Sequence, residues 1–375
     1  MKVGCPKEIK AQEFRVGLTP AAVNELVRHG HFVTIETNAG QGAGFVDSDY
    51  EKEGADIVGS AKEVFDKADM IVKVKEPQAI ERKMLKSGQL LFTYLHLAPD
   101  PEQTHDLIDS GCTAIAYETV TDLHGGLPLL APMSEVAGRL APQMGAWTLQ
   151  KANGGRGILL GGVPGVAPAK VLVLGGGVVG TNAARVAAGM GADVTVLDKS
   201  LSRLRYIDDV FGHLFKNGYA SQKATAELAS QADLIIGAVL VAGAEAPKLI
   251  SKEQLSTLQP GTALVDVAID QGGCFETSRA TTHADPIYEI DGIMHYCVAN
   301  MPGAVARTST LALGNATLPF IISLADKGWI KACSDNPHLF NGLNVHDGKL
   351  TYSAVGEALG IETVKPDLKA LSILH

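Results

Sequence analysis

Three glycines and one acid have the spacing of a phosphate-binding turn. Gly175-x-Gly177-x-x-Gly180 follows the apolar run Val171–Leu174, and Asp198 ends the next apolar run eighteen residues after Gly180. The first glycine permits a tight turn, the second lets the backbone approach a pyrophosphate, and the third lets a helix pack closely on a strand. An acid at the end of the second strand can accept hydrogen bonds from ribose hydroxyls. The pattern therefore predicts a dinucleotide site.

The same residues favour NAD over NADP as the dinucleotide. The negative charge of Asp198 would repel a 2′-phosphate. Arg203, a few residues further on, leaves NADP open as an alternative. A Rossmann-like domain that has lost its ligand would keep the same glycine turn, so the motif alone does not establish binding.

Polar residues outside this turn could bind an anionic substrate and transfer protons. Lys75, His96 and Asp270 each follow an apolar run that is typical of a buried strand. Ligands of parallel sheets bind at the carboxyl ends of the strands, so these three side chains could gather at one site. Histidine is the usual acid/base group in catalysis. Each also has a plain structural interpretation: Lys75 as part of a solvated loop, Asp270 as a turn acid, and Arg15 as a surface cation.

The elements that would position these residues alternate between strand and helix. Thr19 and Pro20 predict a helix start, because Thr is a favoured N-cap and Pro a favoured first helical residue. This alternation is the βαβ pattern of a parallel sheet. In the first third we predict strands at Phe32–Glu36, Met70–Val74, Gln89–Leu95 and Thr113–Tyr117, and a helix at Ser60–Ala68.

A second series of strands runs to about Asn300. Its Val, Leu and Ile content fits strands that are covered on both faces. A long helix, Ser134–Ala152, precedes it, and the remainder of the chain from about Thr308 reads as helical. The predicted elements are the strands Lys170–Leu174, Asp193–Leu197, Leu234–Gly237, Ala263–Val267 and His295–Val298, and the helices Thr181–Met190 and Thr310–Leu324.

These elements predict an α/β fold of two Rossmann-like domains with mostly parallel, doubly wound sheets, separated by a cleft. Residues 1–128 plus 306–375 would form a discontinuous substrate domain, and residues 129–305 the NAD-binding domain. The length of 375 residues and an apolar content of 46% are ample for two cores.

Charge and cysteine content exclude several classes of function. A net charge of -9 and the lack of a Lys/Arg run argue against nucleic-acid binding. The five cysteines form no CxxC pair, which argues against a disulfide framework or a zinc site and favours a cytoplasmic protein. The N-terminus lacks an apolar signal core. The weakly charged stretch between Arg156 and Arg185 is divided by Lys170 into pieces too short to cross a membrane.

Seven motifs spread over essentially the whole chain resemble those of the bacterial L-alanine dehydrogenase family, whose wider circle includes the soluble NAD-binding part of proton-pumping transhydrogenase. So many motifs in one order are highly specific. They are Gly4-Cys5-Pro6-Lys7-Glu8, Arg15-Val16-Gly17-Leu18-Thr19-Pro20, Val72-Lys73-Val74-Lys75-Glu76-Pro77, Tyr94-Leu95-His96-Leu97-Ala98, Ala131-Pro132-Met133-Ser134-Glu135-Val136-Ala137-Gly138, Asp266-Val267-Ala268-Ile269-Asp270-Gln271-Gly272-Gly273-Cys274 and Val298-Ala299-Asn300-Met301-Pro302-Gly303.

The resemblance implies reversible oxidative deamination of L-alanine to pyruvate and ammonium with NAD, by a homohexamer. It implies that Arg15 and Lys75 hold the substrate carboxylate and that His96 and Asp270 are the acid/base groups. Those residue types suit the reaction, because water addition and ammonia loss both need proton transfers. The cofactor contacts that we expect are Ser134, Gly175, Gly177, Val178, Val179, Gly180, Asp198, Arg203, Val239, Leu240, Val267, Ile269, Asp270, Asn300 and Met301.

The chain departs from some relatives at two positions. Ala220 stands where some relatives carry Ser near the adenosine, and loss of the hydroxyl could weaken cofactor binding slightly. Lys327 stands where some relatives carry His, which with the acid at Glu118 could contact a magnesium ion. A charged lysine is a poor metal ligand, so we predict no required metal.

Three rival functions share parts of this pattern. A 2-hydroxy acid dehydrogenase would use the same histidine and cations. The NAD-binding subunit of a membrane proton pump would need a partner that carries transmembrane helices. A catalytically inactive NAD sensor would keep the glycine turn without needing His96 for turnover.

Overall fold

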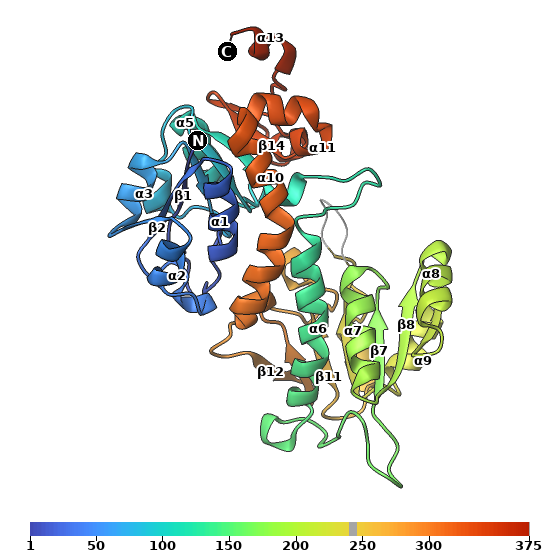
Figure 1. Cartoon of the computed structure of the whole chain (residues 1–375). Helices are drawn as coiled ribbons and strands as arrows, with labels where there is room; N and C mark the ends of the chain where they lie inside the picture. The colour runs from blue at the N-terminus through green and yellow to red at the C-terminus, as the bar shows by residue number, and fades with distance from the viewer. Residues whose placement is uncertain (240–245, 375) are drawn as a thin grey trace. The chain divides into compact units, whose positions relative to one another are not determined.

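The chain forms two units in the computed structural model, which describes residues 1–239 and 246–374. The first unit comprises Met1–Pro132 and Val305–His375, and the second Met133–Ala304. Each unit is a sheet with helices packed against it (Figure 1). The α/β prediction, with two Rossmann-like sheets that are mostly parallel, is therefore confirmed.

The first sheet has eight strands in the order β15-β14-β6-β5-β4-β1-β2-β3. Strands β1 to β6 are parallel, and β14 is antiparallel to β6. The strand order reverses between β1 and β4, which makes their carboxyl ends the expected ligand site of such a sheet. The strands are β1 (Lys2–Cys5), β2 (Phe32–Glu36), β3 (Asp56–Val58), β4 (Met70–Val72), β5 (Leu90–Thr93), β6 (Thr113–Ala116), β14 (Leu343–His346) and β15 (Lys349–Leu350).

Four helices of the first unit, α1, α3, α5 and α11, begin at a side-chain cap. The Thr19 hydroxyl accepts the Ala22 N–H at 3.1 Å, and Val23 and Leu26 are buried. The helices are α1 (Pro20–Arg28), α2 (Asp47–Lys52), α3 (Ala61–Lys67), α4 (Ala79–Arg82), α5 (Pro101–Ser110), α10 (Ala306–Asp335), α11 (Pro337–Phe340), α12 (Ser353–Leu359) and α13 (Leu368–Leu374), with short 3-10 turns η1 (Gln41–Ala43) and η2 (Tyr117–Thr119).

The second sheet has seven strands in the order β12-β13-β11-β10-β7-β8-β9. All neighbours are parallel except β12 and β13, and the order reverses between β7 and β10. The strands are β7 (Lys170–Leu174), β8 (Asp193–Asp198), β9 (Lys216–Tyr219), β10 (Leu234–Gly237), β11 (Ala263–Asp266), β12 (Ile287–Ile290) and β13 (Ile293–Tyr296).

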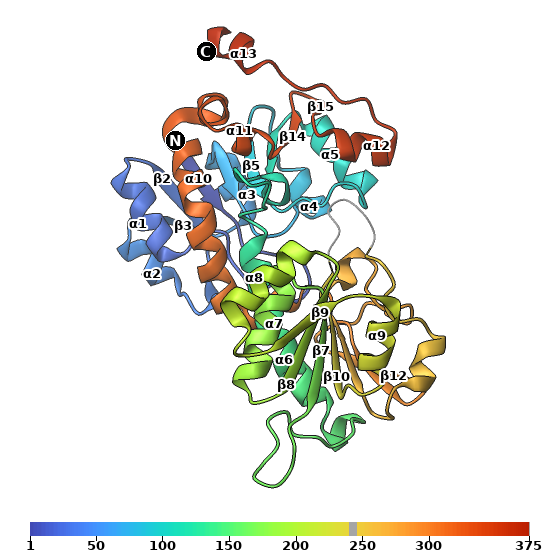
Figure 2. The ribbon, with the colours of Figure 1, turned by 90° about the vertical axis from the view of Figure 1, so that its right-hand side faces the viewer.

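Helices cover both faces of the second sheet. In Figure 2, α6 and α7 lie on one side of the strands and α9 on the other. The helices are α6 (Ala131–Thr148), α7 (Val178–Gly189), α8 (Leu201–Phe211) and α9 (Gln222–Ala229), with 3-10 turns η3 (Lys151–Asn153), η4 (Glu253–Thr257), η5 (Ile269–Gln271) and η6 (Met301–Val305).

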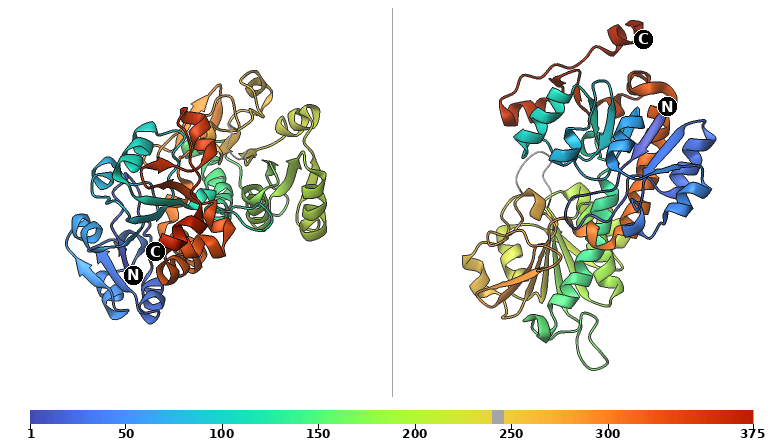
Figure 3. Two further views of the ribbon diagram at one scale, coloured as in Figure 1. Left: turned by 90° about the horizontal axis from the view of Figure 1, so that it is seen from above. Right: turned by 90° about the vertical axis from the view of Figure 1, so that its left-hand side faces the viewer.

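The prediction that the chain after Thr308 is helical was wrong for β14 and β15. Leu343, Asn344 and Val345 are all buried there, and Asp347-Gly348 forms the turn between the strands. Both turn residues have positive φ, 48° and 70°, as a two-residue hairpin turn with Asp-Gly requires. Both views in Figure 3 show the red C-terminal segment lying with the blue and cyan segments of the first unit.

Other differences concern the ends of elements. The helix predicted at Thr310–Leu324 extends over the whole of α10, with non-helical backbone at Gly328. The strand predicted at His295–Val298 begins two residues earlier, as β13. The strands β1, β3, β9 and β12 were not predicted, because their sequences, KVGC, DIV, KNGY and IYEI, do not form continuous apolar runs like those of the predicted strands.

One stretch among the described residues, Met301–Asp335, is long and apolar enough by composition to span a membrane. The sequence analysis had considered a different stretch, between Arg156 and Arg185, as a possible membrane span. A single helix of this kind is weak evidence for a membrane span, because core helices of soluble proteins can be equally long and apolar. Leu313, Ile321 and Leu324 of α10 are buried within the first unit.

Candidate active site

The glycine turn of the second unit joins β7 to α7 and has the shape that a dinucleotide requires. Gly175 has φ 101°, and a Cβ there would lie 2.8 Å from the Ala238 carbonyl oxygen. A Cβ on Gly180 would lie 1.8 Å from the Gly175 oxygen, so only glycine permits this approach. A Cβ on Gly177, in contrast, would meet no atom within 4 Å. Open space at Gly177 is what a pyrophosphate needs, and α7 starts there without a side-chain cap on its N–H groups.

Asp198 lies at the end of β8 and contacts the glycine turn. Its Oδ2 accepts the Gly176 N–H at 2.7 Å and its Oδ1 accepts the Ser200 N–H at 2.7 Å. Arg203 on α8 donates to the Gly176 carbonyl and to the Thr181 hydroxyl. These bonds fix the carboxylate beside the turn, and each carboxylate oxygen can still accept a ribose hydroxyl.

A buried acid that sequence reasoning missed shapes the loop of Asp270. Asp266, at the end of β11, accepts N–H bonds from Ala268 at 3.1 Å and Cys274 at 2.7 Å, together with the Ser278 hydroxyl. Burial raises the pKa of Asp266 above its ordinary value, although these bonds oppose the shift. Asp270 lies in η5 with an exposed side chain. The structure describes no hydrogen bond or ion pair of that carboxylate, which is therefore available to a ligand.

The other expected cofactor contacts lie in separate segments of the second unit. Val239 follows β10, Val267 follows β11, and Ile269 is buried in η5. Asn300 has φ 59° and its carbonyl contacts the His283 ring at 3.2 Å, while the next residue, Met301, is buried. Ser134 lies on α6, about one turn before the Gly138 that approaches Val179 of α7. Leu240 lies outside the described residues.

In the first unit, a buried ion triad holds the loop that carries Lys75. Lys73 is fully buried and its amine contacts Glu8 at 3.0 Å and Glu81 at 2.7 Å. Burial would lower the pKa of Lys73, but the two carboxylates more than offset this and raise it. Glu8 also accepts the backbone N–H of Val74 at 2.7 Å and of Lys75 at 3.3 Å. The Lys75 amine forms no hydrogen bond or ion pair within the described part of the chain.

We expect Lys73→Met to lower the free energy of unfolding by about 3–5 kcal/mol, because two buried carboxylates then face each other without a cation. Urea unfolding followed by circular dichroism measures the change. The matched control is Lys67→Met, which removes an exposed ion pair with Asp56 at 2.9 Å and should cost about 0–1 kcal/mol. Equal unfolding midpoints for the two variants would contradict a structural role of the triad.

Arg15 lies in the long loop after β1 and is almost fully buried. Its Nε and terminal nitrogen pair with the two oxygens of Glu13 at 2.7 and 2.6 Å. Burial opposes the charge, yet the bonds from Glu13 raise the pKa of Arg15, so the guanidinium stays charged. A guanidinium has five N–H donors in a fixed fork, a geometry that suits carboxylates.

His96 lies just beyond β5 with an unusual backbone. Its φ is 50°, a left-handed conformation that costs a non-glycine residue about 1–3 kcal/mol. Its ring is 45% exposed and stacks on Tyr94, with centroids 5.8 Å apart. Lys75 and His96 thus follow neighbouring strands, β4 and β5, at the carboxyl end of the first sheet.

The possible magnesium contacts are engaged elsewhere. Glu118 accepts backbone N–H bonds from Leu95 and His96, and Lys327 pairs with Asp335 at 2.9 Å. Among the described residues no group of three or more His, Cys, Asp or Glu side chains could hold a metal. The absence of a required metal stays a prediction. Ala220 is half-buried at the end of β9, where its N–H donates to the Asp198 carbonyl.

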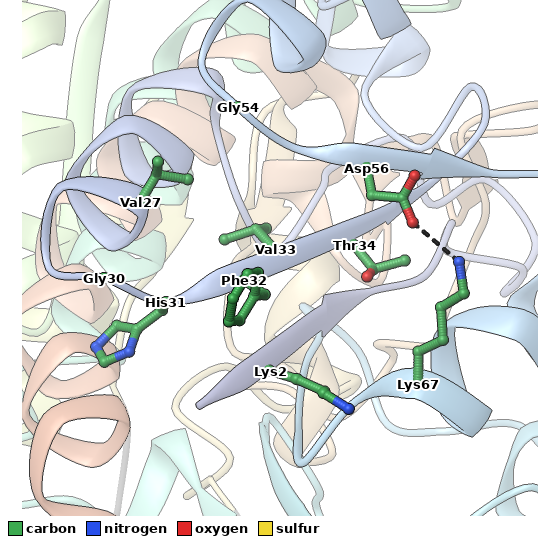
Figure 4. Close-up of a pocket in the computed structure, with 10 residues that line it drawn as sticks. All are labelled: Lys2, Val27, Gly30, His31, Phe32, Val33, Thr34, Gly54, Asp56 and Lys67. Atoms are coloured by element: carbon green, nitrogen blue, oxygen red, sulfur yellow. Dashed lines mark hydrogen bonds and ion pairs between the residues drawn. The ribbon is translucent and has the colours of Figure 1, made fainter.

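A surface pocket of about 710 Å³ lies away from these residues (Figure 4). Lys2, Phe32 and Asp56, which line it, are the first residues of β1, β2 and β3, and Lys67 pairs with Asp56 there. The pocket therefore lies at the amino ends of the strands. The candidate residues follow the carboxyl ends, so this pocket is not their site.

Fold and site together define a two-domain α/β protein whose second unit has a Rossmann-like fold with a glycine turn between β7 and α7. Comparison with known proteins is more specific. Residues 4–137 match the family model "Alanine dehydrogenase/PNT, N-terminal domain", and residues 141–353 match "Alanine dehydrogenase/PNT, C-terminal domain". The chain belongs to the alanine dehydrogenase/PNT family.

Individual relatives match over nearly the full length. Alanine dehydrogenase of Halomonas elongata is 61% identical over 97% of this chain and 98% of that protein. The Bacillus subtilis alanine dehydrogenase is 53% identical over 99% and 98%. A solved L-alanine dehydrogenase superposes with a TM-score of 0.93 at 50% identity, covering 96% of this chain and 99% of that one. A transhydrogenase from Sinorhizobium meliloti gives 0.81 at 25% identity, covering 94% and 100%.

Proposed function

We propose that the protein is an L-alanine dehydrogenase, which converts L-alanine, NAD and water reversibly to pyruvate, ammonium and NADH. It is an oxidoreductase of the amino acid dehydrogenase class, like the relatives that match it over nearly their whole length. The observation that carries the assignment is that one chain has both a glycine turn suited to a dinucleotide and polar residues suited to an amino acid substrate. The second unit has an open glycine turn at a helix start. In the first unit Lys75, whose amine has no partner among the described residues, and the exposed His96 follow adjacent strands.

The first unit supplies the groups for the substrate. Lys75 and Arg15 bind the carboxylate of alanine, and Lys75 also contacts the keto oxygen of pyruvate. Two cations for one carboxylate fix Cα in position, and such positioning lowers the barrier to reaction. The buried triad around Lys73 supports this role, because it holds the backbone of Lys75 through Glu8.

Proton transfer falls to His96 and Asp270. Hydride loss from Cα leaves an iminium group on the substrate, and water must then add to that carbon. His96 takes a proton from the water and returns one to the departing amine, a task suited to an imidazole near neutral pH. Asp270 is the second acid/base group, and its exposed carboxylate supports this assignment.

The glycine turn and Asp198 fit NAD. NAD, when bound, accepts the hydride from Cα. The N–H groups at the start of α7 would hold the pyrophosphate, and Asp198 the adenosine ribose. Since Arg203 already donates to Gly176 and Thr181, it offers less to a 2′-phosphate than a free guanidinium would. The other expected contacts, Ser134, Val239, Leu240, Val267, Ile269, Asn300 and Met301, complete the proposed site.

We further propose a cytoplasmic homohexamer that binds neither membrane nor nucleic acid. The negative net charge supports the absence of nucleic-acid binding. All five cysteines are free and buried, which fits a reducing compartment. The hexamer rests on the family resemblance alone.

The decisive assay compares small substrates with the purified chain. We expect NADH formation with L-alanine to exceed that with L-lactate by about 100-fold or more, because a site built for an amine leaves polar groups unpaired with its hydroxyl analogue. NADP in place of NAD should give slower turnover, since Asp198 repels a 2′-phosphate. A preference for lactate would favour a 2-hydroxy acid dehydrogenase. Failure to turn over alanine would favour a transhydrogenase-type subunit, an alternative that the alanine dehydrogenase relatives matching over nearly the full length do not favour.

A further inference from the structure

The backbone of His96 must be held in place by something outside its own strand. The φ of 50° is one that a non-glycine residue rarely adopts, and the ring is nearly half exposed. Stacking on Tyr94 supports the ring from one side, because the planes are 9° from parallel. Tyr94 is itself fixed by its hydroxyl, which donates to the Leu129 carbonyl at 2.5 Å. This stacking orients the ring but leaves the left-handed backbone of His96 unexplained.

Glu118 reaches that backbone from the neighbouring strand. It lies in η2, directly after β6, and β6 pairs with β5 in register, Thr93 opposite Ala116. Glu118 Oε1 accepts the His96 N–H at 2.6 Å and the Leu95 N–H at 3.1 Å, and Oε2 lies 3.2 Å from the same Leu95 nitrogen. Its side chain is only 15% exposed. Two consecutive N–H groups therefore point at one shielded carboxylate, which anchors the backbone on which His96 is carried.

We propose that Glu118 is a positioning residue for His96, a role that rests on the proposed function of His96 in proton transfer. The Glu118 carboxylate accepts hydrogen bonds from the Leu95 and His96 N–H groups. By holding this backbone segment in place, it fixes the position of the imidazole ring. It acts neither on the substrate nor as a proton carrier. The ring Nδ1 lies 3.9 Å from Glu118 Oε1, beyond hydrogen-bond distance, so the contact runs through the backbone.

Two conservative substitutions of Glu118 separate the effect of side-chain length from the effect of charge. Glu118→Gln keeps an oxygen at the same distance and loses the charge, so we expect kcat for alanine oxidation to stay within about threefold of wild type. Glu118→Asp keeps the charge but withdraws the carboxylate by about 1.5 Å, the length of one C–C bond. We expect that variant to lose about 10- to 100-fold in kcat, because a misplaced catalytic group costs that much. The KM for alanine and the affinity for NADH should change little in both variants.

A double-mutant cycle tests whether Glu118 acts through His96. In a His96→Asn background, Glu118→Asp should change the residual rate by less than about twofold, since the group that it positions is gone. Asp122→Ala is the matched control: its carboxylate also accepts two backbone N–H groups of the same unit, those of His124 and Gly126, both at 2.8 Å, but they belong to its own loop and not to that of His96. That variant should retain wild-type kcat. Thermal unfolding of each variant shows that it is folded.

Each outcome has a distinct meaning. Activity in Glu118→Asp with none in Glu118→Gln would show that the charge matters and would overturn the proposal. So would losses that simply multiply in the double variant. If His96→Asn itself retains full turnover, the proposed function of His96 fails first, and the positioning role falls with it. If His96→Asn is inactive but Glu118→Asp is fully active, only the positioning role fails.

Discussion

His96→Asn is expected to lower kcat for alanine oxidation by about 10²- to 10⁴-fold, the usual contribution of a positioned acid/base group. Asn is the informative replacement, because it tolerates the left-handed backbone of His96 better than most residues while having no group that titrates near neutral pH. Binding of NADH, measured by fluorescence titration, should stay within about twofold, since the expected dinucleotide contacts lie in other segments. Steady-state rates in both reaction directions give the size of the loss.

A second histidine of the same unit provides the control for this variant. His105 lies on α5 with an exposed side chain, and His105→Ala should leave kcat unchanged. Loss of NADH binding together with turnover would show that His96→Asn damages the fold, and thermal unfolding would detect this. Wild-type turnover in a folded His96→Asn enzyme would refute the assigned role and favour a chain that senses NAD without reacting.

The glycine turn gives the second large effect, with opposite consequences at two of its glycines. Gly177→Ala should change stability by less than about 1 kcal/mol. The new methyl meets no atom within 4 Å and φ there is -67°, while Ala is a poorer N-cap for α7 than Gly. The substitution should nevertheless weaken NADH binding by about 10- to 100-fold, since the methyl occupies the space proposed for the pyrophosphate. Gly180→Ala should lower the free energy of unfolding by about 1–3 kcal/mol or more, because its Cβ would lie 1.8 Å from a carbonyl oxygen.

Urea unfolding and NADH titration of the same protein preparations measure both quantities. Gly189→Ala is the matched control, because it lies at the other end of α7 and also faces open space. It should alter neither NADH affinity nor stability by much. Unchanged NADH affinity in Gly177→Ala would place the dinucleotide elsewhere, and unchanged stability in Gly180→Ala would mean that the turn can open without cost.

Features with local sequence signals were predicted well. The apolar runs of β5, β7, β10 and β11 gave their strands to within a few residues, since buried parallel strands are continuous in Val, Leu and Ile. The glycine turn was predicted because its three glycines, close together in sequence, each have a distinct steric reason: a tight turn, the approach of a pyrophosphate, and close packing of a helix on a strand. The hairpin of β14 and β15 was missed although it has a signal, an Asp-Gly pair between alternating residues.

The supports of the candidate residues could not be read from the sequence. Glu8 and Lys73 are distant in the chain, and only the reversal of strand order between β1 and β4 brings them together. Asp266 lay inside the predicted strand Ala263–Val267, yet its buried side chain holds the loop that carries Asp270. Such roles depend on which backbone N–H groups come within reach, and spacing along the chain does not contain that information.

The hairpin of β14 and β15 also has a consequence for synthesis of the protein on the ribosome. It covers the edge of β6, and β6 is made more than two hundred residues earlier. At about 5–20 residues per second, that edge waits roughly ten seconds or longer before its partner strand emerges. The second unit is continuous in sequence and can fold during this interval. The first unit is therefore completed last, and until then the nascent chain exposes an open strand edge on which chaperones or other chains can act.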